Sequence, residues 1–184
     1  EDTQLNQTEY TQPAILTVST AFTALLREAG ITADYLAGLS LGEYTALVEA
    51  GVLSFEDAVD LVSHRGRFMQ AAAPIGAGKM VAVMKAERAL IEDICQQVRE
   101  ASGQYVAPAN YNTPKQIVIG GDASAVDTAV AKLTEAGVKK MVELNVSGPF
   151  HTALLSQASD QLADYLDKFD FKPQRVPVIS NTTA

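Results

Sequence analysis

The chain has 184 residues, 47% of them hydrophobic and 20% charged, with a formal net charge of −8 at pH 7. This length and composition allow one domain, or one domain with an insert, to bury a sizeable core. The acidic balance argues against non-specific nucleic-acid binding and against a basic membrane-surface helix, and no apolar run is long enough to span a bilayer.

Cysteine and histidine are scarce in this sequence. Cys95 is the only cysteine and there are two histidines, so we predict no disulfide framework, no metal site and a reducing compartment such as the cytoplasm. The chain begins with Glu1 in place of a methionine and stops at Ala184, shortly after an apolar run. We therefore expect both ends to be cuts within a longer protein.

The first predicted element is a helix opened by Thr11-Gln12-Pro13, where an early proline loses no hydrogen bond. Gly30 marks its end. Its apolar residues recur at helical spacing, and they are Ile15, Val18, Phe22, Leu25, Leu26 and Ala29. A strand is predicted over Tyr35–Leu39, followed by a turn and a helix that runs to Gly51.

The turn between this strand and helix reads Gly38-Leu39-Ser40-Leu41-Gly42, the G-x-S-x-G pattern of a nucleophile elbow. Glycine on either side of the serine relieves crowding in such a turn. Ser40 and Glu43 also fit a capping box, but a capping box does not account for the glycines, since glycine in a first helical turn costs about 1 kcal/mol relative to alanine. Ser40 is therefore a candidate nucleophile.

Ser54 is predicted to cap the next helix. The apolar stripe of that helix consists of Ala58, Leu61, Val62, Phe68 and Met69. Arg65 falls on the same stripe, and a guanidinium that faces inward is costly unless an anion meets it. The alternatives are an ion pair with a core carboxylate or a side chain that reaches the surface. His64 falls on the opposite, polar face, and we interpret it as an exposed histidine near Asp60.

The pattern changes between Lys79 and Leu144. The predicted elements are a strand Met80–Met84, a helix 87–101, strands Tyr105–Tyr111 and Gln116–Gly120, a helix 123–136 and a strand Lys140–Leu144. The order β-α-β-β-α-β predicts a ferredoxin-like subdomain over 79–144. It is inserted into a larger α/β hydrolase-like subdomain with a parallel sheet, formed by 1–78 and 145–184. Gly76-Ala77-Gly78 is interpreted as a hinge, and Gly120-Gly121-Asp122 as a turn.

The segment Gly148-Pro149-Phe150-His151 precedes a helical stripe that includes Leu154 and Leu155. His151 extends that stripe by one turn, so we expect it to point inward at a helix start. There the helix dipole disfavours the imidazolium and leaves the ring able to accept a proton. The alternative is a buried histidine bonded to a backbone carbonyl. The final run, Val176 to Ser180, is predicted to be a strand that returns to the main sheet.

These signals together indicate acyl chemistry. A serine hydroxyl needs a base to become a good nucleophile, and His151 is the better of the two candidates. The N–H of Leu41 would stabilise a tetrahedral oxyanion, and Arg65 would bind a substrate carboxylate. We predict an acyl transferase or hydrolase with a Ser-His dyad, acting on an acyl group that carries a free carboxylate. No aspartate stands in a setting that clearly completes a triad.

The chain resembles the malonyl-CoA:acyl carrier protein transacylases of bacterial fatty-acid synthesis and the related acyltransferase domains of polyketide synthases. Its matching pieces keep the family's order along nearly the whole chain. They are Thr11-Gln12-Pro13-Ala14, Gly38-Leu39-Ser40-Leu41-Gly42-Glu43-Tyr44, Arg65-Gly66-Arg67-Phe68-Met69-Gln70, Asn110-Tyr111-Asn112 with Gln116, and Gly148-Pro149-Phe150-His151.

The resemblance implies that Ser40 is acylated, that His151 is its base and that Arg65 binds the malonyl carboxylate. The other substrate-binding residues that it implies are Leu41, Phe150, which goes with malonyl rather than methylmalonyl, Met69 and Asn110. It also implies a ping-pong reaction, in which malonyl passes from coenzyme A to the serine and then to the phosphopantetheine thiol of an acyl carrier protein. The resemblance implies that the coenzyme A thioester is the substrate and that no separate cofactor is needed, and we expect no part for a metal, nucleic acid or membrane.

The chain departs from the family's pattern in two respects. Leu39 stands where the family usually has a histidine immediately before the nucleophile. The family's Gly-Gln-Gly segment, which supplies a second oxyanion donor, and the C-terminal residue that orients the histidine are expected outside this chain.

The alternatives in other classes are a serine esterase or thioesterase and a non-catalytic module that docks a carrier protein. An uncharged acyl chain would leave Arg65 without a counter-charge, and the intact set of Ser40, Arg65 and His151 argues against a docking module. Because carrier proteins are usually acidic, docking on this acidic chain is expected to use a local basic patch.

Overall fold

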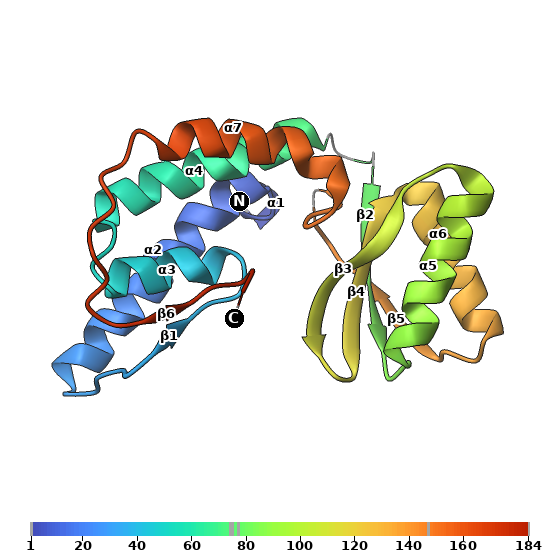
Figure 1. Cartoon of the computed structure of the whole chain (residues 1–184), viewed down its shortest axis with the longest axis horizontal. Coiled ribbons are helices and arrows are strands. Elements are labelled where there is room, and N and C mark those ends of the chain that lie inside the picture. Colours follow the sequence, from blue (N-terminus) through green and yellow to red (C-terminus); the bar gives the residue numbers. More distant parts are fainter. Residues whose placement is uncertain (1, 74–75, 77, 147, 184) are drawn as a thin grey trace. The chain divides into compact units, whose positions relative to one another are not determined.

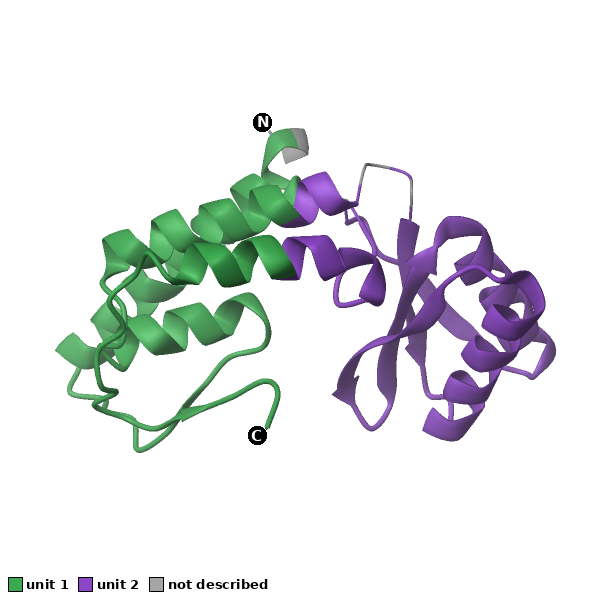
Figure 2. Ribbon diagram, turned by 45° about the horizontal axis from the view of Figure 1, so that its top comes forward, with its two compact units in different colours: residues 1–68, 160–184 green, residues 69–159 purple. Residues whose placement is uncertain are grey.

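The computed structural model describes residues 2–73, 76, 78–146 and 148–183 of an α/β protein. One sheet is parallel and has two strands, and the other is antiparallel and has four. The chain divides into two compact units (Figure 2): unit 1 comprises Glu1–Phe68 and Asp160–Ala184, and unit 2 comprises Met69–Ser159. Unit 2 contains the whole of the predicted segment 79–144. No helix in the described ranges is long and apolar enough to cross a membrane.

Unit 1 combines helices with the parallel sheet. Its elements are α1 (Asp2–Leu5), α2 (Thr8–Glu28), β1 (Leu36–Ala37), α3 (Leu41–Glu49), α4 (Phe55–Ala72) as far as Phe68, α7 (Ser156–Leu166) from Asp160 onward, and β6 (Val178–Ile179). β1 pairs with β6, Leu36 lying opposite Val178 and Ala37 opposite Ile179. The predicted return of the last apolar run to the sheet is confirmed. Both strands are shorter than predicted, and β1 stops where the chain turns at Gly38.

The core of unit 1 lies between its helices. Its fully buried side chains include Leu16 of α2 and Leu61 and Val62 of α4. The predicted cap of α4 is confirmed, because the Ser54 hydroxyl accepts a hydrogen bond of 3.0 Å from the Asp57 N–H.

The interpretation of His64 as an exposed histidine is wrong. Its ring stacks on Tyr165 at 4.1 Å between ring centroids and is half-buried. Its contact with Asp60 is present, at 3.2 Å between Nδ1 and Oδ1. The polar face of α4 is covered because α7 lies alongside it (Figure 1). The sequence of α4 contains no sign of this partner, which comes from about a hundred residues further along the chain.

α2 differs from the prediction at its start and along its apolar face. It begins at Thr8, so Pro13 lies inside the helix rather than in its first turn. Leu16 is fully buried, but the side chains of the predicted stripe are exposed among the described residues. The exposed fractions are 49% for Ile15, 55% for Val18, 62% for Phe22, 59% for Leu25 and 48% for Leu26.

Unit 2 is built around the antiparallel sheet. Its elements, besides the ends of α4 and α7, are β2 (Gly78–Met84), α5 (Arg88–Ser102), β3 (Val106–Thr113), β4 (Gln116–Asp122), α6 (Ala123–Glu135), β5 (Lys140–Glu143) and a 3-10 turn η1 (Ala153–Leu155). The strand order across the sheet is β3-β4-β2-β5. Figure 1 shows α5 and α6 on one face of this sheet. The predicted alternation of strands and helices in this segment is present.

The two faces of this sheet carry different side chains, as strand alternation requires. Val81, Val83 and Ile119 point to the face that α5 and α6 cover. Met80, Ala82 and Val118 form a smaller cluster on the other face, with Leu144 and Phe150 packed against it.

The predicted turn at Gly120-Gly121-Asp122 is wrong, because these residues belong to β4. A Cβ on Gly121 would lie 2.0 Å from the carbonyl oxygen of Tyr105, so the glycine permits a close approach of two backbones inside the sheet. Of the predicted hinge at 76–78, Ala77 lies outside the described residues, and Gly78 begins β2.

Candidate active site

Ser40 sits on a sharp turn between β1 and α3. Its backbone has φ 52° and ψ −106°, a conformation that costs a non-glycine residue about 1–3 kcal/mol. A Cβ on Gly38 would lie 2.0 Å from the carbonyl carbon of Gly42, so the turn requires glycine at position 38. The second predicted glycine requirement is not seen, because a Cβ on Gly42 would meet no described atom within 4 Å.

The guanidinium of Arg65 lies beside this serine. Its Nη2 donates a hydrogen bond of 3.0 Å to the Ser40 Oγ, and its Nη1 donates one of 2.5 Å to the Oε1 of Gln12. Its Cζ lies 5.4 Å from the ring centroid of Tyr44. α4 therefore presents Arg65 toward the turn, as its position on the inward stripe predicted.

Burial decides the electrostatics around this guanidinium. Desolvation lowers the pKa of Arg65 and raises the pKa of the neighbouring Tyr44 hydroxyl. Arginine nevertheless stays protonated in proteins. Among the described residues Arg65 forms no ion pair within 4.0 Å, so the alternative of a structural pair with a core carboxylate is not seen there. A bound anion would stabilise the half-buried guanidinium, because it would replace interactions with water that burial removes.

The position of Arg65 depends on a close approach of α2 and α4. A Cβ on Gly66 would lie 2.7 Å from the Cα of Glu9, so only glycine lets the two helices pack this closely. The approach brings the buried Gln12 within reach of Arg65, and Gln12 donates its Nε2–H to the Thr8 hydroxyl at 2.9 Å. The sequence analysis assigned no role to Gln12, although it belongs to one of the matched segments.

Asn181 is a residue of this site that the sequence analysis missed. Its Oδ1 accepts a hydrogen bond of 2.6 Å from the Ser40 N–H, and its Nδ2 donates to the carbonyl oxygen of Gly38. Its own N–H lies 3.4 Å from the Oε1 of Glu43. Polar residues just beyond the ends of parallel strands gather at one sheet edge. Asn181 directly follows the last predicted strand, so its position in the sequence could have placed it near the Ser40 turn.

Leu41 is the first residue of α3, where N–H groups lack an intrahelical acceptor. Leu39 is 67% exposed, so the leucine before the serine does not pack into the core of the described chain. Beside the turn lies a hollow of about 390 Å³, lined by Ala37, Gly38, Leu39, Ile179, Ser180 and Asn181. The two strand ends thus leave open space next to Ser40.

His151 belongs to unit 2, and the prediction that it points inward at a helix start is wrong. It is exposed and lies in a turn with φ 59°, two residues before η1 and five before α7. The left-handed backbone breaks the helical path, so the stripe of α7 does not extend back to it. Ser147 of the preceding segment lies outside the described residues.

The turn that carries His151 rests on the antiparallel sheet. A Cβ on Gly78 would lie 2.6 Å from the Cγ of Pro149, and a Cβ on Gly120 would lie 3.2 Å from the Cγ2 of Thr152. Small residues in β2 and β4 therefore let this turn approach the strands closely.

The remaining predicted site residues also lie in unit 2. Phe150 packs on the Met80, Ala82 and Val118 cluster. Met69 is buried near the end of α4, and Asn110 is half-buried in β3 opposite Val118. Unit 1 by itself thus brings together Ser40, Arg65 and Leu41, and unit 2 carries His151, Phe150, Met69 and Asn110.

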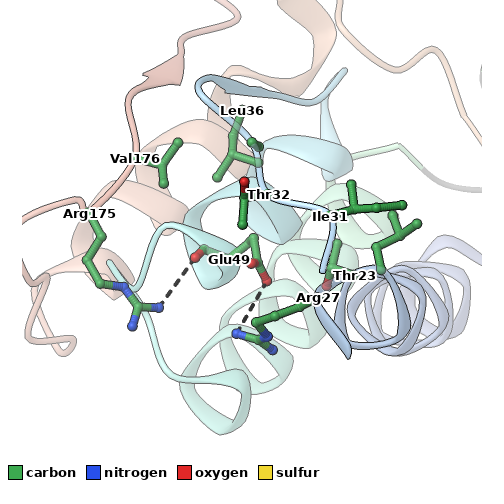
Figure 3. Close-up of a pocket in the computed structure, with 10 residues that line it drawn as sticks. Thr23, Arg27, Ile31, Thr32, Leu36, Glu49, Arg175 and Val176 are labelled. Atoms are coloured by element: carbon green, nitrogen blue, oxygen red, sulfur yellow. Dashed lines mark hydrogen bonds and ion pairs between the residues drawn. The ribbon is translucent and has the colours of Figure 1, made fainter. Parts of the chain in front are cut away.

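Two further features of the described chain bear on possible sites outside the Ser40 turn. No group of three or more His, Cys, Asp or Glu side chains within the described ranges is arranged to hold a metal ion. A pocket of about 320 Å³ in unit 1 lies between α2, β1 and the segment before β6 (Figure 3). In it, Arg27 faces the Glu49 carboxylate at 3.9 Å and Arg175 donates to the Glu49 carbonyl oxygen at 3.4 Å. None of the predicted site residues lines this pocket.

Comparison with known proteins places this geometry in a family. The malonyl CoA-acyl carrier protein transacylase of Bacillus subtilis is 46% identical over 181 residues, covering 98% of this chain and 57% of the relative. The crystal structure of malonyl-CoA:acyl carrier protein transacylase from Xanthomonas oryzae matches with a TM-score of 0.94 at 49% identity, over 98% of this chain and 57% of that one.

A malonyl-transacylase solved in complex with a type II PKS acyl-carrier protein matches with a TM-score of 0.94 at 41% identity, over 98% of this chain and 58% of that one. The chain therefore spans less than two thirds of the length of these relatives. The sequence pattern of the acyl transferase domain matches residues 1–184. The chain belongs to the acyl transferase domain family.

Proposed function

We propose that the protein is an acyltransferase that moves a malonyl group from coenzyme A to the phosphopantetheine thiol of an acyl carrier protein. The observation that carries this proposal is the 3.0 Å contact between Arg65 and the Ser40 hydroxyl. A half-buried cation at this distance from a nucleophile favours an acyl group with a carboxylate close to the reacting carbonyl. Malonyl thioesters have that chemistry.

The proposed reaction has two transfers through one intermediate. Ser40 Oγ attacks the thioester carbonyl, its proton passes to His151, and the Leu41 N–H stabilises the oxyanion. Collapse breaks the carbon–sulfur bond, and coenzyme A leaves with the proton as a thiol. The carrier thiol then gives its proton to His151 and attacks the carbonyl of malonyl-Ser40. The ester carbon–oxygen bond breaks, malonyl stays on the carrier as a thioester, and Ser40 takes the proton back from His151. The coenzyme A thioester enters as substrate, and the roles of His151, Phe150, Met69 and Asn110 rest on the family resemblance.

We propose two finer assignments of the fold. The Ser40 turn is a nucleophile elbow of an α/β hydrolase-like subdomain, which is supported by its positive φ, the glycine at position 38 and the parallel β1–β6 pair. Residues 79–144 form a ferredoxin-like subdomain, which is supported by the strand order β3-β4-β2-β5 and by two helices on one face.

The names of the relatives support the choice of substrate and acceptor. They are malonyl transacylases, and one of them was solved with a polyketide-type carrier protein. A polyketide synthase-type acyltransferase would use the same chemistry with a different carrier. An esterase or thioesterase is disfavoured, because an uncharged acyl group would leave the partly desolvated guanidinium of Arg65 without a counter-charge.

The test is the intact mass of the natural full-length protein after separate incubation with malonyl-CoA and with acetyl-CoA. We expect a malonyl adduct on the unchanged protein, none on Ser40→Ala, and a selective loss of the malonyl adduct on Arg65→Ala. Arg67→Ala is the matched control, because Arg67 is exposed on the same helix. Absence of any adduct on the unchanged protein would contradict the proposal.

The role of His151 needs a separate comparison. His151→Ala is expected to slow formation of the adduct by about 10²-fold or more, since general bases contribute about 10²–10⁴-fold. His64→Ala is the matched control, because His64 is the other histidine of the chain and packs on Tyr165. Equal rates for the two variants would remove His151 from the proposed dyad.

A further inference from the structure

The strained backbone of Ser40 needs neighbours that hold it. A non-glycine residue in such a conformation persists only where the surrounding structure over-determines it. After the serine, the Gly42 N–H donates to the Leu39 carbonyl at 2.9 Å and the Glu43 N–H donates to the Ser40 carbonyl at 3.2 Å. These bonds begin α3, but they do not engage the Ser40 N–H or the Gly38 carbonyl.

A single side chain engages both of those groups. The Asn181 amide accepts from the Ser40 N–H at 2.6 Å and donates to the Gly38 carbonyl oxygen. A carboxamide has an acceptor and a donor on one planar group, so it can bridge an N–H and a C=O two residues apart. The parallel register of β1 and β6 brings the amide to the turn, because both strands end at the same edge.

We propose that Asn181 is a positioning residue for the nucleophile. It holds Ser40 in the conformation that presents its hydroxyl to Arg65 and to the substrate, and it acts through the backbone of Ser40 without touching the acyl group. This inference rests on the proposed function, because its main test measures the rate at which malonyl is transferred to Ser40. It goes beyond that function because it assigns to the Asn181 amide, in addition to Gly38, a part in setting the geometry of the reactive serine.

A merely structural role makes a different prediction. If Asn181 only tied the end of β6 to the unit, its loss would lower stability without a specific effect on the serine. Gln174 offers a matched control, because its Oε1 accepts from the Val178 N–H at 3.3 Å and so supports the same strand. Gln174→Leu removes a side-chain bond to β6 and leaves the Ser40 turn intact.

The experiment compares Asn181→Leu, Asn181→Asp and Gln174→Leu in the natural full-length protein. The readouts are the rate constant for malonyl adduct formation, the KM for malonyl-CoA and the melting temperature. We expect Asn181→Leu to lower the acylation rate constant about 10- to 100-fold, since a small misplacement of a reacting group costs this much. The KM should change less than about twofold, because Arg65 keeps its place. Gln174→Leu should acylate at the unchanged rate.

Asn181→Asp adds a pH signature. A protonated aspartic acid can accept from Ser40 and donate to Gly38, whereas the carboxylate repels the Gly38 carbonyl. The acylation rate of this variant relative to the unchanged protein should therefore rise as the pH falls from 8 toward 5. Asn181→Leu should show no such rise. Equal ratios at all pH values for both variants would contradict the bridging role.

A second probe separates this inference from the proposed function. Phenylmethylsulfonyl fluoride labels reactive serines without needing a carboxylate, and the rate of its reaction with Ser40 reports on the serine alone. Slower labelling of Asn181→Leu with unchanged labelling of Gln174→Leu supports the positioning role even if no malonyl adduct forms. Unchanged labelling and acylation in Asn181→Leu, or equal losses in Asn181→Leu and Gln174→Leu, would overturn it.

Discussion

The two units differ in how completely their sheets are covered. The sheet of unit 2 has four strands, and α5 and α6 close one face over a continuous core. The sheet of unit 1 has two short strands, and most of the large apolar side chains of α2, Leu16 excepted, are exposed in the described chain. Yet Ser40, with its strained backbone, and its neighbour Arg65 belong to unit 1. The unit with the smaller sheet thus carries the candidate nucleophile and its neighbouring cation, whereas His151, the candidate base, belongs to unit 2.

The two units also differ in net charge. Unit 1 contains 6 of the 14 basic and 14 of the 22 acidic residues, whereas unit 2 contains 8 of each. The net charge of −8 therefore belongs entirely to unit 1. An acidic carrier protein would be repelled by most of unit 1 and would approach unit 2 more easily.

The largest effect is expected from a methyl group placed in the Ser40 turn. Gly38→Ala puts a Cβ 2.0 Å from the Gly42 carbonyl carbon, so the turn must open and acylation should fall by about 10²-fold or more. Gly42→Ala should keep most activity, because its added Cβ meets no described atom within 4 Å. The acylation rate of each variant, measured by intact mass, checks this. Equal activity of the two would show that the turn is not rigid.

Core truncations should separate the two units by stability. Leu133 of α6 is fully buried, so Leu133→Ala should lower the free energy of unfolding by about 2–5 kcal/mol. Phe22 of α2 is 62% exposed, and Phe22→Ala should cost less than about 1 kcal/mol. Urea unfolding of this 184-residue chain measures both. A large loss from Phe22→Ala would mean that the α2 face is covered in solution.

A smaller effect is expected at the lysine edge of unit 2, defined as Lys85, Lys115, Lys139 and Lys140. β2 places Met84 opposite Lys140, and the Lys85 N–H donates to the Lys115 carbonyl at 2.8 Å, so these lysines lie at one end of the sheet. All four are exposed and form no ion pair among the described residues. We propose this edge, whose nearest acidic residue in sequence is Glu87, as the basic patch that an acidic carrier would meet.

Changing all four lysines to glutamine should raise the KM for an acidic carrier protein by about 10-fold at low salt and much less at high salt. Formation of the malonyl adduct from coenzyme A should not change. The matched control is Lys168→Gln with Lys172→Gln, two lysines of unit 1. A similar rise in KM for the control would show that carrier docking does not distinguish the units.

The smallest effect concerns Cys95, in the core of unit 2. Burial raises the pKa of its thiol to about 11, so at pH 8 the thiol stays protonated and reacts slowly with alkylating reagents. Its labelling should become fast only when urea unfolds the unit. Fast labelling of the folded chain at pH 8 would mean that the core of unit 2 opens more readily than its packing suggests.

The sequence was a good guide wherever a local pattern decides the structure. The helices and strands between residues 78 and 143 lie within a few residues of their predicted bounds. Local patterns mark them, because α5 and α6 bury residues at helical spacing and β2 and β4 are short buried runs. The inward direction of Arg65 followed from its place on a helical stripe. The turn at Ser40 followed from a glycine that its backbone requires.

The same local patterns misled where a distant segment intervenes. His64 was placed on a polar face, and α7 covers that face. Gly120 and Gly121 were assigned to a turn, since a single sequence does not reveal that a neighbouring strand comes too close for a side chain. His151 was assigned to a helical stripe that the left-handed backbone of its own turn interrupts.

The sequence by itself pointed to Ser40, Arg65 and His151 as candidates for acyl chemistry, because each stands in a recognisable local motif. Only the tertiary structure decided what holds the first two in place. Gln12 reaches Arg65 across 53 residues, and Asn181 reaches Ser40 across 141. Such pairs depend on the packing of two helices and on the register of two parallel strands. Both are set by the burial of whole elements, so no short stretch of sequence contains them.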